Sequence, residues 1–258
     1  MKILLRLSFL GSAYCGYQVQ PNGVSVQQRL NEAAKQLFGY ECDIVGCSRT
    51  DSGVHANEFC ATVSKKKESF IETSIPISRI PQAMSHWLPS DIAVFAAEEV
   101  EDSFHPRYDV KYKEYEYKIL NRQVRDPFLE GRVWHCPKQI DEEGFENMKR
   151  AAAMLVGRKD FSSFMAADST VKDTVREVFS AELEREGDLI TFRVSADGFL
   201  YNMVRIFTGT LVEVAYGKIA VEDIPHIIEA HDRRRAGCTA PPEGLYLNRV
   251  DYKLEKQP

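Results

Sequence analysis

The sequence has no apolar run that approaches the roughly 20 residues needed to span a membrane. Its first six residues are interrupted by Arg6 and lack a small-residue cleavage site, which predicts a strand and not a signal peptide. The six cysteines form no C-x-x-C pair. They therefore predict reduced thiols, with neither a zinc site nor a disulfide framework, and we expect a cytoplasmic protein without membrane contact.

Several catalytic motifs are also missing. The chain has no P-loop, no G-x-G-x-x-G and no H-E-x-x-H, and the residues after His55 lack the H-x-E spacing of a zinc deaminase. The formal net charge of −5 argues mildly against a nucleic-acid partner, although a locally basic groove can bind phosphates on an acidic protein. Of the basic clusters, 65–67 and 233–235 are three residues long, and each alone predicts a solvated surface patch.

The order of predicted elements indicates an α+β fold. Apolar alternation predicts strands over 3–9, 59–63 and 92–100, and helical spacing predicts helices over 26–38 and 76–88. The second half repeats this rhythm, with helices near 142–156 and 221–230 and a helix ending near 215. We expect two related domains, 1–105 and 106–258, with mostly antiparallel, helix-backed sheets that flank a central catalytic cleft.

Between the predicted strands around 43–45 and 59–63 lies a loop of polar and charged side chains, Gly46-Cys47-Ser48-Arg49-Thr50-Asp51-Ser52-Gly53-Val54-His55-Ala56. A loop of this kind presents its side chains to solvent and is a common place for catalytic residues. Taken alone, it also fits a hairpin with an Asp-Ser-Gly turn.

The segment Arg49-Thr50-Asp51-Ser52-Gly53-Val54-His55-Ala56 resembles the R-T-D-A-G-V-H-A signature of TruA-type tRNA pseudouridine synthases, with Ser52 in place of alanine. Further segments match in the same order along nearly the whole chain. They are Phe104-His105-Pro106-Arg107-Tyr108, Gly157-Arg158-Lys159-Asp160-Phe161-Ser162-Ser163-Phe164, Phe199-Leu200-Tyr201-Asn202-Met203-Val204-Arg205 and Glu243-Gly244-Leu245-Tyr246-Leu247.

This resemblance implies a role for five residues. Asp51 would be the catalytic nucleophile, and Arg205 would pair with it and keep it ionised against the effect of burial. Tyr115 would stack on the uracil that is flipped out of its helix, and Arg49 would fill the vacated space or hold the phosphate. Leu245 would wall the base pocket. We expect His55 to order the loop, and Tyr117 to belong to the core.

The activity implied by the resemblance is the isomerisation of uridine to pseudouridine in the anticodon stem-loop of tRNAs. That reaction needs no redox step and no outside energy, so we expect no cofactor and no metal. The resemblance also implies a homodimer that holds each RNA across both subunits. Whether the carboxylate attacks the base or the ribose stays open at this point.

Two alternatives remain. The chain differs from the family pattern at Leu10, Tyr17, Ser52, Pro106 and Cys238, which leaves room for a paralogue that modifies another structured RNA such as rRNA. It could also be a non-catalytic RNA-binding protein on the same scaffold.

Overall fold

The computed structural model describes residues 1–167 and 171–252, and within them the chain divides into two compact units. The first unit comprises Met1–Lys111 together with the chain from Tyr246 onward, and the second comprises Tyr112–Leu245. The sequence predicts a single boundary at 105/106 instead. The two divisions differ mainly in the last strand, and residues 253–258 of the predicted second domain lie outside the described residues.

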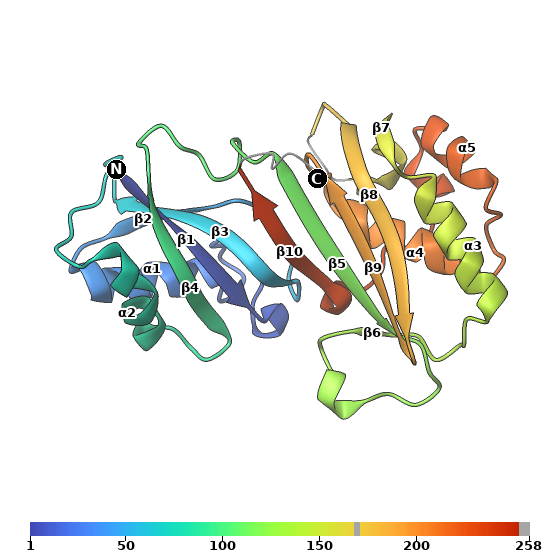
Figure 1. Cartoon of the computed structure of the whole chain (residues 1–258), viewed down its shortest axis with the longest axis horizontal. Coiled ribbons are helices and arrows are strands. Elements are labelled where there is room, and N and C mark those ends of the chain that lie inside the picture. Colours follow the sequence, from blue (N-terminus) through green and yellow to red (C-terminus); the bar gives the residue numbers. More distant parts are fainter. Residues whose placement is uncertain (168–170, 253–258) are drawn as a thin grey trace. The chain divides into compact units, whose positions relative to one another are not determined.

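The first unit is a mainly antiparallel sheet with two helices (Figure 1). Strand β1 lies between β3 and β4, and β2 pairs with the other edge of β3; all of these pairs are antiparallel. Helices α1 and α2 pack on each other, α1 also on β2 and α2 also on β4. The elements are β1 (Lys2–Phe9), α1 (Val26–Phe38), β2 (Cys42–Gly46), β3 (His55–Lys65), α2 (Ile80–Trp87) and β4 (Ile92–Val100).

The last strand, β10 (Leu245–Asp251), belongs to the first unit from Tyr246 onward, and it pairs in parallel with β3, with Tyr246 opposite His55. This pairing joins residues almost 200 positions apart in the chain. No local sequence pattern specifies such a partner, which is why the division of the chain differs from the predicted one.

The second unit is also a mainly antiparallel sheet backed by helices. Strand β9 lies between β5 and β8, and β8 also pairs with β7; these pairs are antiparallel, whereas the short β6 runs parallel to its neighbour β5. Helix α4 packs on α3 and β5. The elements are β5 (Tyr112–Leu120), β6 (Trp134–His135), α3 (Glu142–Ala153), β7 (Gly157–Asp160), β8 (Val175–Glu186), β9 (Leu189–Ala196), α4 (Met203–Ala215) and α5 (Asp223–Glu229). The predicted α+β class is confirmed.

Local sequence signals account for both ends of α1 and for the start of α2. Ser25 caps α1 by accepting a hydrogen bond from the Gln28 N–H at 3.2 Å, and Gly39 ends that helix at φ 77°. Helix α2 begins at Ile80, later than predicted, after a 3₁₀ turn over Ile77–Arg79. Pro81 explains the late start, because a proline is tolerated only in the first turn of a helix.

Strand β5 buries one of its charged side chains as well as two of its tyrosines. Tyr117 is fully buried, as predicted, but Glu116 on the same strand is also only 7% exposed. Its carboxylate lies 3.0 Å from Arg193 on the neighbouring strand β9, and this cross-strand ion pair compensates for the loss of water.

Within the described residues, no helix has both the length and the apolar character needed to cross a bilayer. All six cysteines are free thiols.

Candidate active site

The predicted Asp51 loop joins β2 to β3, which pair as an antiparallel hairpin. The Val54 N–H donates to the Asp51 carbonyl oxygen at 3.2 Å, and Gly53 adopts φ 82°. The predicted Asp-Ser-Gly turn is therefore confirmed. Asp51 is half-buried in this turn, whereas Arg49 is exposed.

A glycine-containing segment of the first unit, residues 11–17, fixes the backbone of this loop. A Cβ on Gly11 would lie 1.9 Å from the Val54 carbonyl oxygen, and a Cβ on Gly16 would lie 2.4 Å from that of Thr50. Gly16 also has φ 91°, a conformation that side chains disfavour. The Tyr17 N–H donates to the same Thr50 oxygen at 3.3 Å. The backbone on both sides of Asp51 is thus held by contacts that only glycine permits.

His55 ties the end of the loop to the same segment. Its Nδ1 accepts a hydrogen bond from the Gly11 N–H at 2.9 Å, and its ring stacks on Tyr246 with centroids 4.6 Å apart. The side chain is fully buried. A nitrogen that accepts a hydrogen bond carries no proton, so this imidazole is neutral. The geometry confirms the prediction that His55 orders the loop.

In the second unit, Tyr115 and Tyr117 lie on β5. Tyr115 is 7% exposed. Its ring makes an edge-to-face contact with the ring of Phe199, with centroids 5.0 Å apart and ring planes at 87°. The Tyr117 hydroxyl donates to the Pro241 carbonyl oxygen at 2.6 Å. Phe199 is the first residue of the motif segment that ends at Arg205, and its contact with Tyr115 could not be predicted from that segment alone.

Arg205 projects from the first turn of α4 and is half-buried. Its Nε donates to the Ala240 carbonyl oxygen at 2.8 Å, and its Nη1 donates to Oδ1 of Asn202 at 2.8 Å. Asn202 precedes the helix at φ 61°, a conformation that asparagine tolerates. Two neutral oxygens therefore hold the Nε and Nη1 atoms of the guanidinium.

The five predicted site residues fall into two groups. Arg49 and Asp51 share one loop of the first unit, and Tyr115 and Arg205 lie in the second unit. Leu245, the first residue of β10, is 7% exposed and closes the second unit. The Asp51–Arg205 ion pair and the stacking role of Tyr115 stay predictions.

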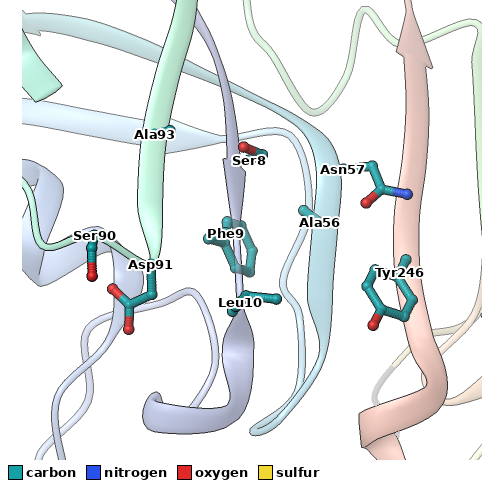
Figure 2. A pocket seen from close by; sticks show the side chains of 9 residues that line it. All are labelled: Ser8, Phe9, Leu10, Ala56, Asn57, Ser90, Asp91, Ala93 and Tyr246. Carbon is teal, nitrogen blue, oxygen red and sulfur yellow. The ribbon is translucent and has the colours of Figure 1, made fainter. Parts of the chain in front are cut away.

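A pocket of about 250 Å³ lies elsewhere in the first unit (Figure 2). Its one carboxylate, that of Asp91, accepts a hydrogen bond from the Tyr14 hydroxyl at 2.6 Å. None of the predicted site residues lines this pocket. The lining residues are Ser8, Phe9, Leu10, Ala56, Asn57, Ser90, Asp91, Ala93 and Tyr246.

Comparison with known proteins decides the family. The sequence profile described as tRNA pseudouridine synthase matches residues 151–253. Proteins named tRNA pseudouridine synthase A from Thermoanaerobacter sp. (strain X514) and Acetivibrio thermocellus are each 42% identical over 250 residues, which cover 97% of this chain and 99% of theirs. The protein of the same name from Caldicellulosiruptor bescii is 40% identical over 250 residues, which again cover 97% of this chain and 99% of its own. The chain belongs to the tRNA pseudouridine synthase A family.

Membership makes the chain a pseudouridine synthase, as the resemblance of its motifs predicted. Among solved structures, a Cbf5-Nop10-Gar1 complex matches with a TM-score of 0.34 at 14% identity, over 94% of this chain and 57% of that one. Within 1–167 and 171–252, no three His, Cys, Asp or Glu side chains gather as a metal site would require.

Proposed function

We propose that this pseudouridine synthase converts uridine to pseudouridine in the anticodon stem-loop of tRNAs, with Asp51 as the covalent nucleophile. The observation that carries the proposal is the near-complete alignment, at 42% identity, with relatives named tRNA pseudouridine synthase A. We further propose that the enzyme is a cytoplasmic homodimer that holds each RNA across both subunits.

The reaction is an isomerisation in which atoms and electrons balance within the substrate. The Asp51 carboxylate adds to the base or to the ribose C1′, and the N1–C1′ bond breaks. The freed uracil rotates, a C5–C1′ bond forms, C5 loses its proton and N1 gains one. The carboxylate then leaves unchanged, so covalent catalysis by one side chain suffices.

The surroundings of Asp51 support this role. A nucleophile reacts faster when its approach is fixed before the substrate arrives. Gly11, Gly16 and His55 fix the backbone on either side of Asp51, while the side chain itself is only half-buried. The loop thus combines a defined position with access for the substrate.

The other four residues would act on the RNA and on the charge of the nucleophile. Extrusion of a stacked uridine costs a few kcal/mol. Stacking on Tyr115 would return about 1–3 kcal/mol, and Arg49, exposed beside Asp51, would hold the vacated position or the phosphate. Arg205 would keep Asp51 ionised while Leu245 walls the base.

The test is to incubate the purified chain with unmodified tRNA and with rRNA, and then to map pseudouridine. Product in the anticodon arm supports the proposal. Product in rRNA alone would instead support a paralogue with another target, which the departures at Leu10, Tyr17, Ser52, Pro106 and Cys238 would then explain. Absence of product from every RNA would indicate a binding protein. Sedimentation of the same sample gives the oligomeric state.

Two variants test the residue assignments. Asp51→Asn keeps the shape of the side chain but removes the nucleophile, so it should bind tRNA and form no product. Asp43→Asn is the matched control, because Asp43 is an exposed aspartate on the same hairpin and should tolerate the change. Product formation by Asp51→Asn would exclude Asp51 as the nucleophile.

Tyr115→Ala should lose turnover far more than affinity, because phosphate contacts supply most of the binding free energy. Single-turnover rates and tRNA dissociation constants, measured on the same preparation, separate these effects. Equal losses in rate and affinity would contradict the stacking role.

A further inference from the structure

Three consecutive arginines, Arg233–Arg235, form a 3₁₀ turn after α5, and they differ in where their side chains lie. The Arg234 guanidinium pairs with Asp232 at 2.8 Å on the surface, and Arg235 is exposed. Arg233 is half-buried. Arg234 and Arg235 therefore form the predicted solvated patch, and Arg233 does not belong to it.

The Arg233 guanidinium binds the chain that follows it. Its Nη1 donates to the carbonyl oxygens of Ala236 and Gly237, at 3.3 and 2.8 Å, and its Nη2 donates to Oγ1 of Thr239 at 2.9 Å. Burial lowers the pKa of Arg233, but an arginine stays charged at any physiological pH. One side chain thus gathers three acceptors from the segment 236–240 with charge-assisted hydrogen bonds.

The same segment packs against α4 at backbone contact. A Cβ on Gly209 would lie 1.9 Å from the Cys238 carbonyl oxygen, and a Cβ on Gly237 would lie 2.6 Å from Cα of Thr210. The Gly237 N–H also donates to Oγ1 of Thr210 at 2.9 Å. There is no room for the segment to move closer to the helix, so Arg233 and α4 together define its position.

This segment ends on Arg205. The Ala240 N–H donates to the Arg205 carbonyl oxygen at 3.1 Å, and the Ala240 carbonyl oxygen accepts from Nε of Arg205 at 2.8 Å. A displacement of Ala240 would therefore turn the guanidinium of Arg205. The contacts run without a gap from Arg233 through the segment 236–240 to Arg205.

We propose that Arg233 is a positioning residue, which holds the segment 236–240 against α4 and thereby sets the direction of the Arg205 guanidinium. This inference rests on the proposed function, in which Arg205 faces the nucleophile. Lysine cannot replace Arg233, because a single ammonium group does not reproduce the planar fork that reaches three acceptors. Arg234 and Arg235 provide matched controls in the same turn.

The experiment compares Arg233→Lys with Arg234→Lys and Arg235→Lys. Each variant is measured for its Tm, its tRNA dissociation constant over a range of salt concentrations, and its single-turnover rate. We expect Arg233→Lys to lower the rate by about 10- to 100-fold, as small displacements of catalytic groups do, with affinity and salt dependence unchanged. The two control variants should keep the wild-type rate.

A double-mutant cycle with Arg205→Lys separates positioning from general loosening of the fold. If Arg233 acts through Arg205, the double variant should be no slower than Arg205→Lys alone. Additive losses would overturn the proposal. So would a weaker affinity and a shallower salt dependence at an unchanged rate, because they would make Arg233 a phosphate contact.

Crystal structures of wild type and Arg233→Lys test the inference without activity. We expect the hydrogen bond between Nε of Arg205 and the Ala240 carbonyl oxygen to break or shift in the variant. An unchanged Arg205 would refute the positioning role even in an active enzyme. If the wild-type chain makes no product from any RNA, the proposed function is refuted. The crystal structures would still show whether Arg233 positions Arg205.

Discussion

Replacement of Tyr17 by phenylalanine should stabilise the protein, although Tyr17 is only 2% exposed and belongs to the core of the first unit. Its ring stacks on Phe59 with centroids 4.3 Å apart, and a Cβ on Gly46 would lie 2.4 Å from it. Its hydroxyl is buried and has no hydrogen-bond partner among the described residues. The packing contacts are made by the ring and not by the hydroxyl, so phenylalanine retains them.

The magnitude follows from the cost of the hydroxyl. A buried polar group without a partner costs about 1–3 kcal/mol. The variant regains this amount and loses only the dispersion contacts of one oxygen atom, at about 0.1–0.2 kcal/mol each. A net gain of about 1 kcal/mol corresponds to a rise in Tm of about 2–4 °C for a chain of this size.

The pH dependence of the gain has a definite sign. Burial raises the pKa of Tyr17 well above 10.0, so the unfolded chain loses this proton at a lower pH than the folded chain. The stability of the wild type therefore falls as the pH rises above 10, and Tyr17→Phe removes that contribution. The advantage of the variant should widen from about pH 10 upward.

The assay is thermal unfolding of Tyr17→Phe beside Tyr117→Phe, its matched control. Tyr117 is equally buried, but its hydroxyl donates to the carbonyl oxygen of the half-buried Pro241, so its removal deletes this hydrogen bond and should lower the Tm. Opposite signs for the two variants would support the reasoning. A fall in Tm for Tyr17→Phe as large as that for Tyr117→Phe would refute it.

Two further substitutions test how the Asp51 loop is held. Gly16→Ala would bring a Cβ to 2.4 Å from the Thr50 carbonyl oxygen at a φ of 91°. The substitution should therefore displace the loop and slow single turnover more than it lowers tRNA affinity. An unchanged rate would show that the contact is dispensable. His55→Ala should lower the free energy of unfolding by about 1–3 kcal/mol in chemical denaturation, because it leaves the Gly11 N–H unpaired. His55→Gln should recover part of this loss if the stability depends on a hydrogen-bond acceptor at position 55.

Features that depend on neighbouring residues could be predicted from the sequence. Helix α1 covers the predicted residues, between its cap Ser25 and Gly39, and strand β4 has the predicted limits. The polar loop around Asp51 is also local, because a hairpin turn is encoded by the few residues that form it.

Features that depend on distant residues could not be predicted in this way. The alternation along β5 places Glu116 and its partner Lys118 on the face opposite the tyrosines, but the second cation on the Glu116 carboxylate, Arg193, lies 77 residues away. Likewise, three identical side chains at 233–235 give no sign of which one turns inward, since that depends on the carbonyl groups of the folded segment beside it.

By itself, the sequence determined the α+β class, the family motifs and the loop that carries Asp51, because secondary structure and turns follow from contacts within a few residues. The tertiary structure alone decided that β10 pairs with β3, that His55 is a buried acceptor, and that the Tyr17 hydroxyl finds no partner in 1–167 and 171–252. Pairing of strands and removal of water depend on groups that only folding brings together.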